Sequence, residues 1–258
     1  MIRKSGVHDE QSVASLYQSE GVAATYIQKR FGNTWGRLLH RQQVAEVNRV
    51  ISMYQPQSIL EIAPGPARIA VDLHGVREGI LLDNSQQMLD HARQRLVASG
   101  LDTVWEIRHG NAFDLSKLER KFDFLYTFRF MRHFQREERA RLYQNITACL
   151  ASEGFFMLDV VNKAVRQKLD EKHPTKPPGE LDIYDETYTA EAFRQEMQAY
   201  GFHVLRLLPI LAHFIPQSWV SARLDHRCPA VSEMLVRALE YVPSSGPLEW
   251  VALCQKAA

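Results

Sequence analysis

The feature that most constrains the fold is a regular alternation of short apolar segments and helical patterns between residues 58 and 161. The apolar segments have the length and composition of buried strands and cover residues 58–63, 79–83, 104–108, 122–128 and 155–161. Between them, Ser85 can cap a helix over 86–99, and residues 137–150 repeat apolar side chains at helical spacing. Such alternation predicts an α/β fold with a mostly parallel sheet and helices on both faces.

The flanking segments are predicted to complete the same domain. Residues 1–52 carry apolar side chains at helical spacing, so we expect an N-terminal helical cover on the core formed by residues 53–258. Residues 163–186 are polar and contain several prolines, which favours a lid-like excursion. The other predicted elements are a helix that begins within 68–73, a helix over 190–200 capped by Thr189, a strand over 202–212, a helix over 228–239 and a strand over 249–255. The two late strands bring the predicted sheet to seven strands.

Composition and charge argue against several classes of protein. The chain has 31 Lys and Arg against 30 Asp and Glu, so its net charge of +1 gives no case for a general binder of nucleic acids or anionic membranes, although a local patch is compatible with it. No stretch reaches the roughly 18 apolar residues of a membrane span, and the first residues lack the apolar core of a signal peptide. The cysteines and histidines show no metal-binding spacing. We therefore expect a cytoplasmic protein without a metal site, and a homodimer remains open.

Two features at the ends of neighbouring predicted strands indicate a ligand site. The strand over 58–63 runs into a tight turn around Gly65, and the strand over 79–83 ends in Asp83. Ligands of open α/β sheets bind beyond the carboxyl ends of the strands. A turn of small residues lets a ligand approach the backbone, and a carboxylate at Asp83 can accept both hydroxyls of a ribose. Each feature alone has an ordinary structural explanation, but their joint placement favours a nucleoside.

Motifs along the alternating region carry a resemblance to a known family. They read ILEIAPGPAR over 59–68, LDNSQQML over 82–89, GNAFDL over 110–115, FDFLYTF over 122–128 and SEGFFMLD over 152–159. In this order they resemble the class I S-adenosylmethionine-dependent methyltransferases, specifically the small-molecule group called type 11 or type 12. The resemblance runs from about Ile59 to Val161. It implies a Rossmann-like, seven-stranded, mostly parallel sheet and S-adenosylmethionine as cofactor.

The resemblance assigns the cofactor contacts. Glu61 would brace the loop or reach the methionine amino group, Gly65 would present its backbone, and Asp83 would hold the ribose. Met88 would pack on adenine, or serve only as a core methionine. The predicted cofactor residues are Glu61, Ala63, Gly65, Asp83, Asn84, Met88, Asn111, Ala112, Phe113, Thr127 and Phe128.

Three residues depart from the family pattern. Ala63 and Ala67 stand where the family carries glycine, and alanine disfavours a positive φ. Asn111 stands where the family carries aspartate, although its amide oxygen can still accept from the adenine amino group. We expect these departures to affect cofactor affinity more than the fold.

The segment after the strand over 122–128 lies where the methyl acceptor is expected. Arg129 and His133 are the predicted catalytic residues, because an arginine can bind an acidic group and an imidazole titrates near neutral pH. The predicted substrate contacts are Tyr17, Tyr26, Arg129, Arg132, His133 and Tyr184. In the alternative interpretation, the arginines pair with Glu137 or Glu138 and His133 caps the next helix.

The function predicted from the sequence is in-line transfer of a methyl group from S-adenosylmethionine to a small-molecule acceptor, with oxygen as the preferred acceptor atom. Two alternatives stay open. A nicotinamide-dependent oxidoreductase shares the turn and the acidic strand end, but the complete glycine motif is absent. A non-catalytic module could also retain the fold.

Overall fold

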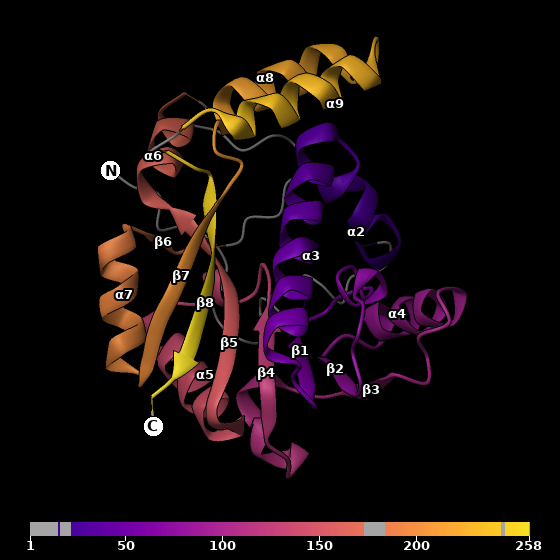
Figure 1. Cartoon of the computed structure of the whole chain (residues 1–258), viewed down its shortest axis with the longest axis vertical. Helices are drawn as coiled ribbons and strands as arrows, with labels where there is room; N and C mark the ends of the chain where they lie inside the picture. The colour runs from indigo at the N-terminus through magenta and orange to yellow at the C-terminus, as the bar shows by residue number, and fades with distance from the viewer. Residues whose placement is uncertain (1–14, 16–21, 173–183, 244–245, 258) are drawn as a thin grey trace.

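The computed structural model describes Ser15 and residues 22–172, 184–243 and 246–257, and a twisted sheet lies at their centre (Figure 1). The strands lie in the order β3–β2–β1–β4–β5–β8–β7, and β6 pairs with β5 beside this path. Their bounds are β1 Ile59–Ile62, β2 Gly79–Asp83, β3 Trp105–His109, β4 Phe122–Thr127, β5 Leu150–Asn162, β6 Thr187–Tyr188, β7 Phe202–Ile210 and β8 Glu249–Lys256. Only β8 runs antiparallel to its neighbours, β5 and β7. The predicted α/β, mostly parallel sheet is confirmed, with the two-residue β6 added to the seven-stranded path.

Helices cover both faces of the sheet. Those described are α2 Val22–Phe31, α3 Thr34–Tyr54, α4 Gln86–Ala98, α5 Arg136–Cys149, α6 Lys163–Lys172, α7 Ala190–Ala199, α8 Phe214–Leu224 and α9 Pro229–Ala238. Alternate residues of β1 separate two apolar layers: Leu60 and Ile62 share one with α5 and α7, and Ile59 shares the other with α3, α4 and α9. Because both faces of the central strands β1 and β2 are buried, most of their residues are apolar.

Local capping signals set several helix boundaries. The Ser85 side chain accepts a hydrogen bond from the backbone N–H of Met88, and the Thr189 side chain accepts one from Ala192. Both predicted caps are therefore confirmed. Pro209 lies in β7, which is an edge strand and tolerates the missing N–H donor.

Two predicted segments differ from the structure, and one helix was not predicted. The helix expected to begin within 68–73 is a single 3₁₀ turn, η1 (Ala70–Asp72), because the chain becomes extended at Leu73 and Gly75 takes φ +71°. The region predicted as a lid-like excursion begins with a helix, α6, and residues 173–183 lie outside the described residues. Helix α8 had no counterpart in the sequence analysis.

No helix in the described ranges is both long and apolar enough to cross a membrane. The division into a cover over residues 1–52 and a core over residues 53–258 stays a prediction. In the described part of that cover, α3 packs on one face of the sheet.

Candidate functional site

A cavity lies beyond the carboxyl ends of β1, β2 and β4, where the strand order reverses between β1 and β4. The space within this first cavity and its mouth, open solvent included, is about 740 Å³. Nine residues predicted to bind the cofactor line it: Ala63, Gly65, Asp83, Asn84, Met88, Asn111, Ala112, Phe113 and Phe128. The structure therefore gathers residues from four sequence motifs around one space.

The loop after β1 keeps a glycine-type backbone although two of its positions are alanines. Ala63 has φ 52°, Gly65 has φ 56° and Ala67 has φ 54°. The left-handed region costs an L-residue with a Cβ roughly 1–2 kcal/mol, so Ala63 and Ala67 carry strain that glycine would avoid. Their conformation preserves the tight turn and the access of a ligand to its backbone.

Asp83 joins the ends of β1 and β2. Its Oδ2 accepts from the backbone N–H of Gly65 at 3.0 Å, and its Oδ1 accepts from Ser85 at 2.9 Å. Burial raises the pKa of the Asp83 carboxyl to about 6, against the lowering effect of these backbone donors. Asp83 lines the cavity, and a carboxylate oxygen can accept more than one hydrogen bond, which suits a pair of ribose hydroxyls.

Two further residues of the lining, Asn111 and Met88, offer a polar and an apolar group to a flat ring. Asn111 caps the 3₁₀ turn η2 (Ala112–Leu118), and its Oδ1 accepts from the Phe113 backbone N–H at 3.0 Å. Met88 lies near the loop, since a Cβ built at Gly65 would lie 3.8 Å from its Sδ. An adenine between these groups would contact a thioether and an amide.

Glu61 and Thr127, also predicted to contact the cofactor, lie behind the cavity wall. The Tyr126 hydroxyl donates to Glu61 Oε2 at 2.8 Å, and Thr127 Oγ1 donates to the Ile62 carbonyl at 2.7 Å. Burial raises the pKa of Glu61 to about 7 despite the hydrogen bond from Tyr126. In this structure both side chains join β1 to β4, and their contact with a cofactor stays a prediction.

A second cavity adjoins the first and shares Arg129 and His133 with it. The second cavity lies between α2, α3, α6 and the start of α8. The space within it and its mouth, open solvent included, is about 1130 Å³. Five of its lining residues are basic and two are acidic: Lys29, Arg30, Arg129, Arg132 and Arg166, against Asp185 and Glu249. The lining therefore carries an excess of positive charge.

Arg132 lies in a buried ionic network. Its guanidinium contacts Asp159 at 2.9 Å, Asp185 at 2.8 Å and Glu249 at 3.3 Å. Burial alone would lower the pKa of Arg132, but the three carboxylates hold it well above its ordinary value. Burial and the neighbouring Asp159 raise the pKa of Glu249 to about 7, against the effect of Arg132. The partners of Arg132 are therefore these carboxylates, and the expected alternative pairing with Glu137 or Glu138 is wrong for it.

His133 lies on the 3₁₀ turn η3 (Met131–His133), where the two cavities meet. Its Nδ1 is 3.0 Å from the Tyr184 carbonyl oxygen and 3.2 Å from Asp185 Oδ1. Because both neighbours are acceptors, these contacts suit the tautomer with the proton on Nδ1. The alternative in which His133 caps the next helix is wrong, since Gln135 is the N-cap residue of α5.

Of the remaining predicted substrate residues, two line a cavity, one does not, and one lies outside the described residues. Tyr26 lines the first cavity and Arg129 lines both, with its backbone N–H donating to Asp159 at 2.6 Å. The Tyr184 hydroxyl donates to Glu186 and is absent from the lining of both cavities. Tyr17 lies outside the described residues.

Asp185 and Glu249 are site residues outside the predicted set of substrate contacts. Asp185 directly follows the predicted Tyr184, so its acidic side chain was the available signal. Glu249 is the first residue of a predicted strand and gave none. Burial alone would raise the pKa of Asp185, but Arg132 and His133 hold it well below its ordinary value. An ionised Asp185 can thus orient His133.

The residues of the first cavity fit S-adenosylmethionine. A Cβ at Gly65 would project beside Met88 inside the cavity, which leaves the loop backbone accessible. The Asp83 carboxylate suits a ribose, and Asn111 with Met88 suits an adenine. Arg129 and His133 border the side that opens to the second cavity.

Comparison with known proteins agrees with this geometry. Residues 59–154 match the family model described as a methyltransferase domain. No curated protein matches the chain. The family match gives no support to a nicotinamide-dependent oxidoreductase.

Solved structures show the same fold at low sequence identity. Magnesium protoporphyrin IX methyltransferase from Synechocystis PCC 6803, with bound SAH, is 13% identical, with a TM-score of 0.65 over 96% of this chain and 100% of that chain. The DhpI–SAH complex is 16% identical, with a TM-score of 0.60 over 95% of each chain. The [4+2]-cyclase SpnF is 16% identical, with a TM-score of 0.65 over 98% of this chain and 100% of that chain. The cyclase illustrates that the fold alone does not define a reaction.

The family match spans the loop around Gly65, Asp83 and Asn111, which are the residues that line the first cavity. Over residues 59–154 the chain therefore resembles a methyltransferase domain, and its fold is that of structures solved with bound SAH.

Proposed function

We propose that the protein methylates an oxygen atom of a small organic acid that binds in the second cavity. The observation that carries this proposal is the junction of the two cavities at Arg129 and His133. Bound in the first cavity, S-adenosylmethionine would supply an activated methyl group, so alignment and desolvation can provide much of the acceleration.

The charge of the second cavity supports an acidic acceptor. Lys29, Arg30 and Arg166 line it together with the two arginines that follow β4. Apolar side chains such as Trp35 and Phe214 complete the lining and suit the hydrocarbon part of the acceptor. Guanidinium groups bind carboxylates through paired, charge-assisted hydrogen bonds.

His133 supports an acceptor that loses a proton. With Nδ1 turned toward Tyr184 and Asp185, Nε2 is the nitrogen that would accept the proton of a hydroxyl as its oxygen forms the new bond to carbon. Asp185 holds the imidazole in this orientation, in the role of an orienting carboxylate.

Turnover measurements test this proposal. We expect methylation of aromatic hydroxy acids and much slower methylation of the matching neutral amides. Replacement of Lys29 and Arg30 by Met should raise the KM for the acid about tenfold, because a charge-assisted hydrogen bond contributes roughly 1.5–3 kcal/mol. The KM for the neutral amide should stay unchanged.

His133→Gln should lower kcat by about 100-fold or more, since general base catalysis contributes about 10²–10⁴-fold. A titration with S-adenosylhomocysteine controls for cofactor binding, because His133 also borders the first cavity. A protein that binds S-adenosylmethionine and methylates neither acids nor amides would support the non-catalytic alternative. Equal turnover of acids and amides would contradict the proposed acceptor class.

A further inference from the structure

Helices α8 and α9 form a hairpin that connects β7 to β8 at one end of the molecule (Figure 1). The inner side of this hairpin packs on α3. Asp225 accepts hydrogen bonds from the backbone and the hydroxyl of Thr34, and Val236 belongs to the apolar layer that contains α3. The opposite side of the hairpin is turned away from the sheet. It carries the exposed side chains of Trp219, Val231, Met234 and Leu235, and we call it the outer face.

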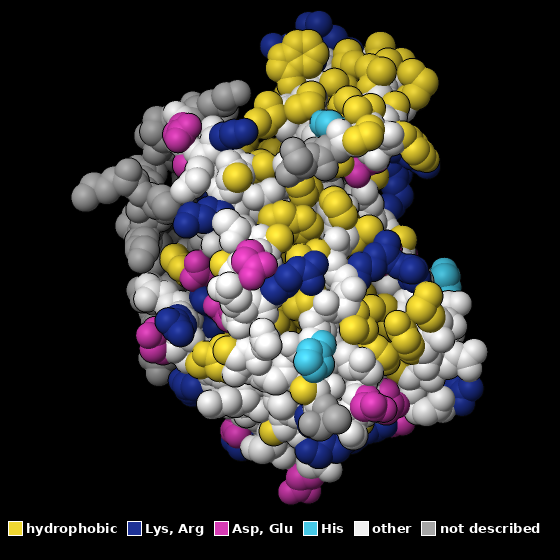
Figure 2. All heavy atoms as spheres, turned by 60° about the vertical axis from the view of Figure 1, so that its left-hand side comes forward, with side chains coloured by type: hydrophobic (Ala, Val, Ile, Leu, Met, Phe, Trp, Pro, Cys, Tyr) yellow, Lys and Arg dark blue, Asp and Glu magenta, His cyan; other side chains and the backbone are white. Residues whose placement is uncertain are grey.

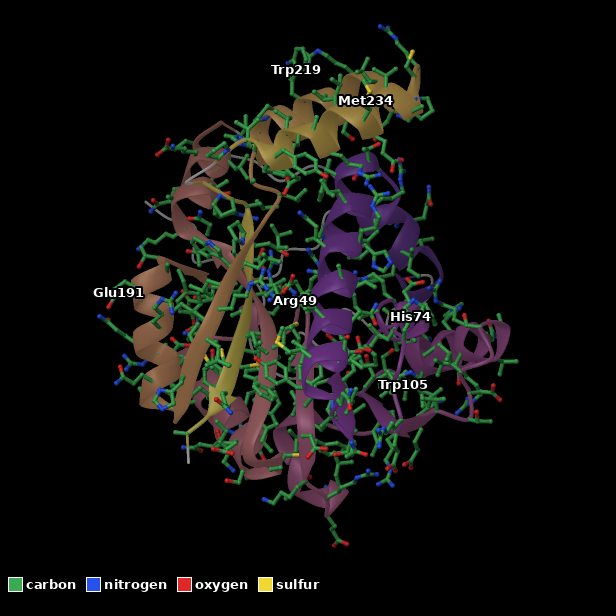
Figure 3. The ribbon with its side chains drawn as sticks, viewed as in Figure 1. Arg49, His74, Trp105, Glu191, Trp219 and Met234 are labelled. Atoms are coloured by element: carbon green, nitrogen blue, oxygen red, sulfur yellow. The ribbon has the colours of Figure 1, made fainter. Side chains whose placement is uncertain are left out.

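The outer face is unusually apolar for an exposed surface. Six of the ten large apolar side chains that are exposed in the described residues lie between residues 214 and 243. Trp219 is 56% exposed, Met234 is 61% exposed and Tyr241 is 87% exposed. Figure 2 shows apolar side chains gathered at this end of the molecule, and Figure 3 shows Trp219 and Met234 on the hairpin.

The spacing along α9 makes this exposure a continuous stripe. Four exposed residues of α9 lie at positions i, i+3, i+4 and i+7: Val231, Met234, Leu235 and Ala238. Residues with this spacing lie on one side of a helix. On the other side of α9, Val236 is buried. Helix α9 therefore has two apolar sides, of which one is buried and the other faces solvent.

The charges of the hairpin are sorted by side. The exposed charged residues between 214 and 243 are Arg223, Arg227 and Arg237, and no acidic side chain of this segment is exposed. Asp225 accepts from Thr34, Ser221 and Ser232, and Glu240 accepts from Gln42 and Gln217. Glu233 is half-buried and pairs with Arg41 and with Arg237. The outer face consequently combines apolar side chains with positive charge.

We propose that the outer face of the α8–α9 hairpin docks on the surface of an anionic lipid bilayer. Helices that lie in a membrane interface combine an apolar side containing tryptophan with arginine or lysine at its border. The Arg223 guanidinium lies 3.8 Å from the centre of the Trp219 ring, so a cation and an indole occupy the same level of the surface. Both groups suit the lipid headgroup region.

The charge pattern also decides against a second copy of the chain as the occupant. A two-fold interface would place the same face against itself and bring the arginines of both copies together. Between residues 214 and 243 three exposed arginines stand against one half-buried glutamate at the surface, Glu233, so the net positive charges of the two copies would repel across the contact. An anionic bilayer supplies the opposite charge along the entire face.

Vesicle sedimentation tests the proposal. The complete chain should bind vesicles of phosphatidylcholine and phosphatidylglycerol, and should not bind vesicles of phosphatidylcholine alone at moderate salt. Each basic residue at an anionic surface contributes about a fivefold gain in affinity. The double variant R223E/R237E should therefore bind at least about 25-fold more weakly, and W219S/M234S should also lose binding.

A matched control separates the hairpin from general surface hydrophobicity. Met53 on α3 and Val97 on α4 are 56% and 58% exposed, similar to Trp219 and Met234. The variant M53S/V97S should bind the mixed vesicles as the unmodified chain does. Thermal melts and titrations with S-adenosylhomocysteine verify that every variant is folded.

Three outcomes would overturn the proposal. The unmodified chain could fail to bind the mixed vesicles, or the control variant could lose as much affinity as W219S/M234S. Sedimentation equilibrium could also show a dimer that W219S/M234S converts into monomers while vesicle binding is absent. The outer face would then be a contact between two copies.

Discussion

Single residues of the cofactor loop combine backbone strain with function. Ala63 and Ala67 adopt the positive φ that their positions require, at a cost that glycine would avoid. Gly65 lies between them, and a Cβ there would point into the first cavity. Ala67 lies outside the lining of the cavity, whereas Ala63 and Gly65 are part of it, and glycine is kept at the position where a Cβ would lie beside Met88.

Gly65→Val should abolish binding of S-adenosylmethionine and destabilise the fold by roughly 1–3 kcal/mol through backbone strain. The control is Gly100→Val, because Gly100 has φ +66° and open space around its Cβ, beyond the end of α4. Both variants should melt at similarly reduced temperatures, but only Gly65→Val should fail in a binding titration. Native affinity in folded Gly65→Val would mean that the cofactor does not contact this loop.

Asp83→Ala should weaken binding of S-adenosylmethionine about tenfold or more, because charge-assisted hydrogen bonds to a ribose contribute roughly 1.5–3 kcal/mol. Since the pKa of Asp83 is about 6 in the free protein, affinity should also fall as the pH decreases through 6 and the carboxylate is protonated. Calorimetry at several pH values measures both effects. Asp90→Ala, on the exposed side of α4, should bind normally. Equal affinities for the two variants would remove Asp83 from the site.

At the scale of elements, Arg139 of α5 connects three segments beside the site. Its guanidinium donates twice to Glu196 of α7 at 3.0 Å and once to Glu186 before β6 at 2.8 Å. A further hydrogen bond of 2.8 Å reaches the Phe134 carbonyl, which follows η3. The arginine therefore helps to hold the segment from Tyr184 to Glu186 near η3, where the contacts of His133 require it.

Arg139→Met should lower the free energy of unfolding by about 3–5 kcal/mol, because it leaves two partly buried carboxylates without their cation. Arg136→Met is the control on the same helix, because Arg136 is exposed, and it should change stability by less than about 0.5 kcal/mol. Urea unfolding followed by circular dichroism measures both. Similar midpoints for the two variants would show that this network does not stabilise the fold.

For the whole molecule, buried carboxylates determine the dependence of stability on pH. The pKa of Glu61 and that of Glu249 are raised by burial to about 7, from an ordinary value of 4.5, and the pKa of Asp83 is raised to about 6. Between pH 7 and pH 4.5 the folded protein binds more protons than the unfolded chain, so the free energy of unfolding increases as the pH falls through this range. His40 opposes this trend, since burial lowers its pKa. Below the window, carboxylates with a lowered pKa such as Asp185 lose their stabilising contribution.

The ligand-free protein should therefore show its highest Tm at about pH 5, and a lower Tm at pH 8. Calorimetric scans over this range measure the effect. Glu249→Gln removes one of the titrating groups while keeping the side-chain shape, so it should flatten the decrease between about pH 5 and pH 7. A Tm that rises steadily from pH 5 to pH 8 would contradict the assignment of raised pKa values to these carboxylates.

The sequence by itself determined the parallel half of the sheet and much of the first cavity. Strands β1, β2 and β4 are mostly apolar because nearly all of their residues are buried, and such runs can be recognised locally. Gly65 and Asp83 lie at the ends of neighbouring strands, so their proximity follows from the topology of a parallel sheet. Predictions based on short segments succeeded where the physical constraint also lies within a short segment.

Only the tertiary structure decided the second cavity and the partners of the residues after β4. Arg132 meets Asp185 and Glu249, which lie 53 and 117 positions further along the chain. No periodicity or cap specifies such pairs, because they form only when the sheet brings β5 and β8 together. The same reason explains why the sequence suggested Glu137 or Glu138 as partners: nearby residues are visible in a sequence, whereas the energy of burying a charge depends on everything that packs around it.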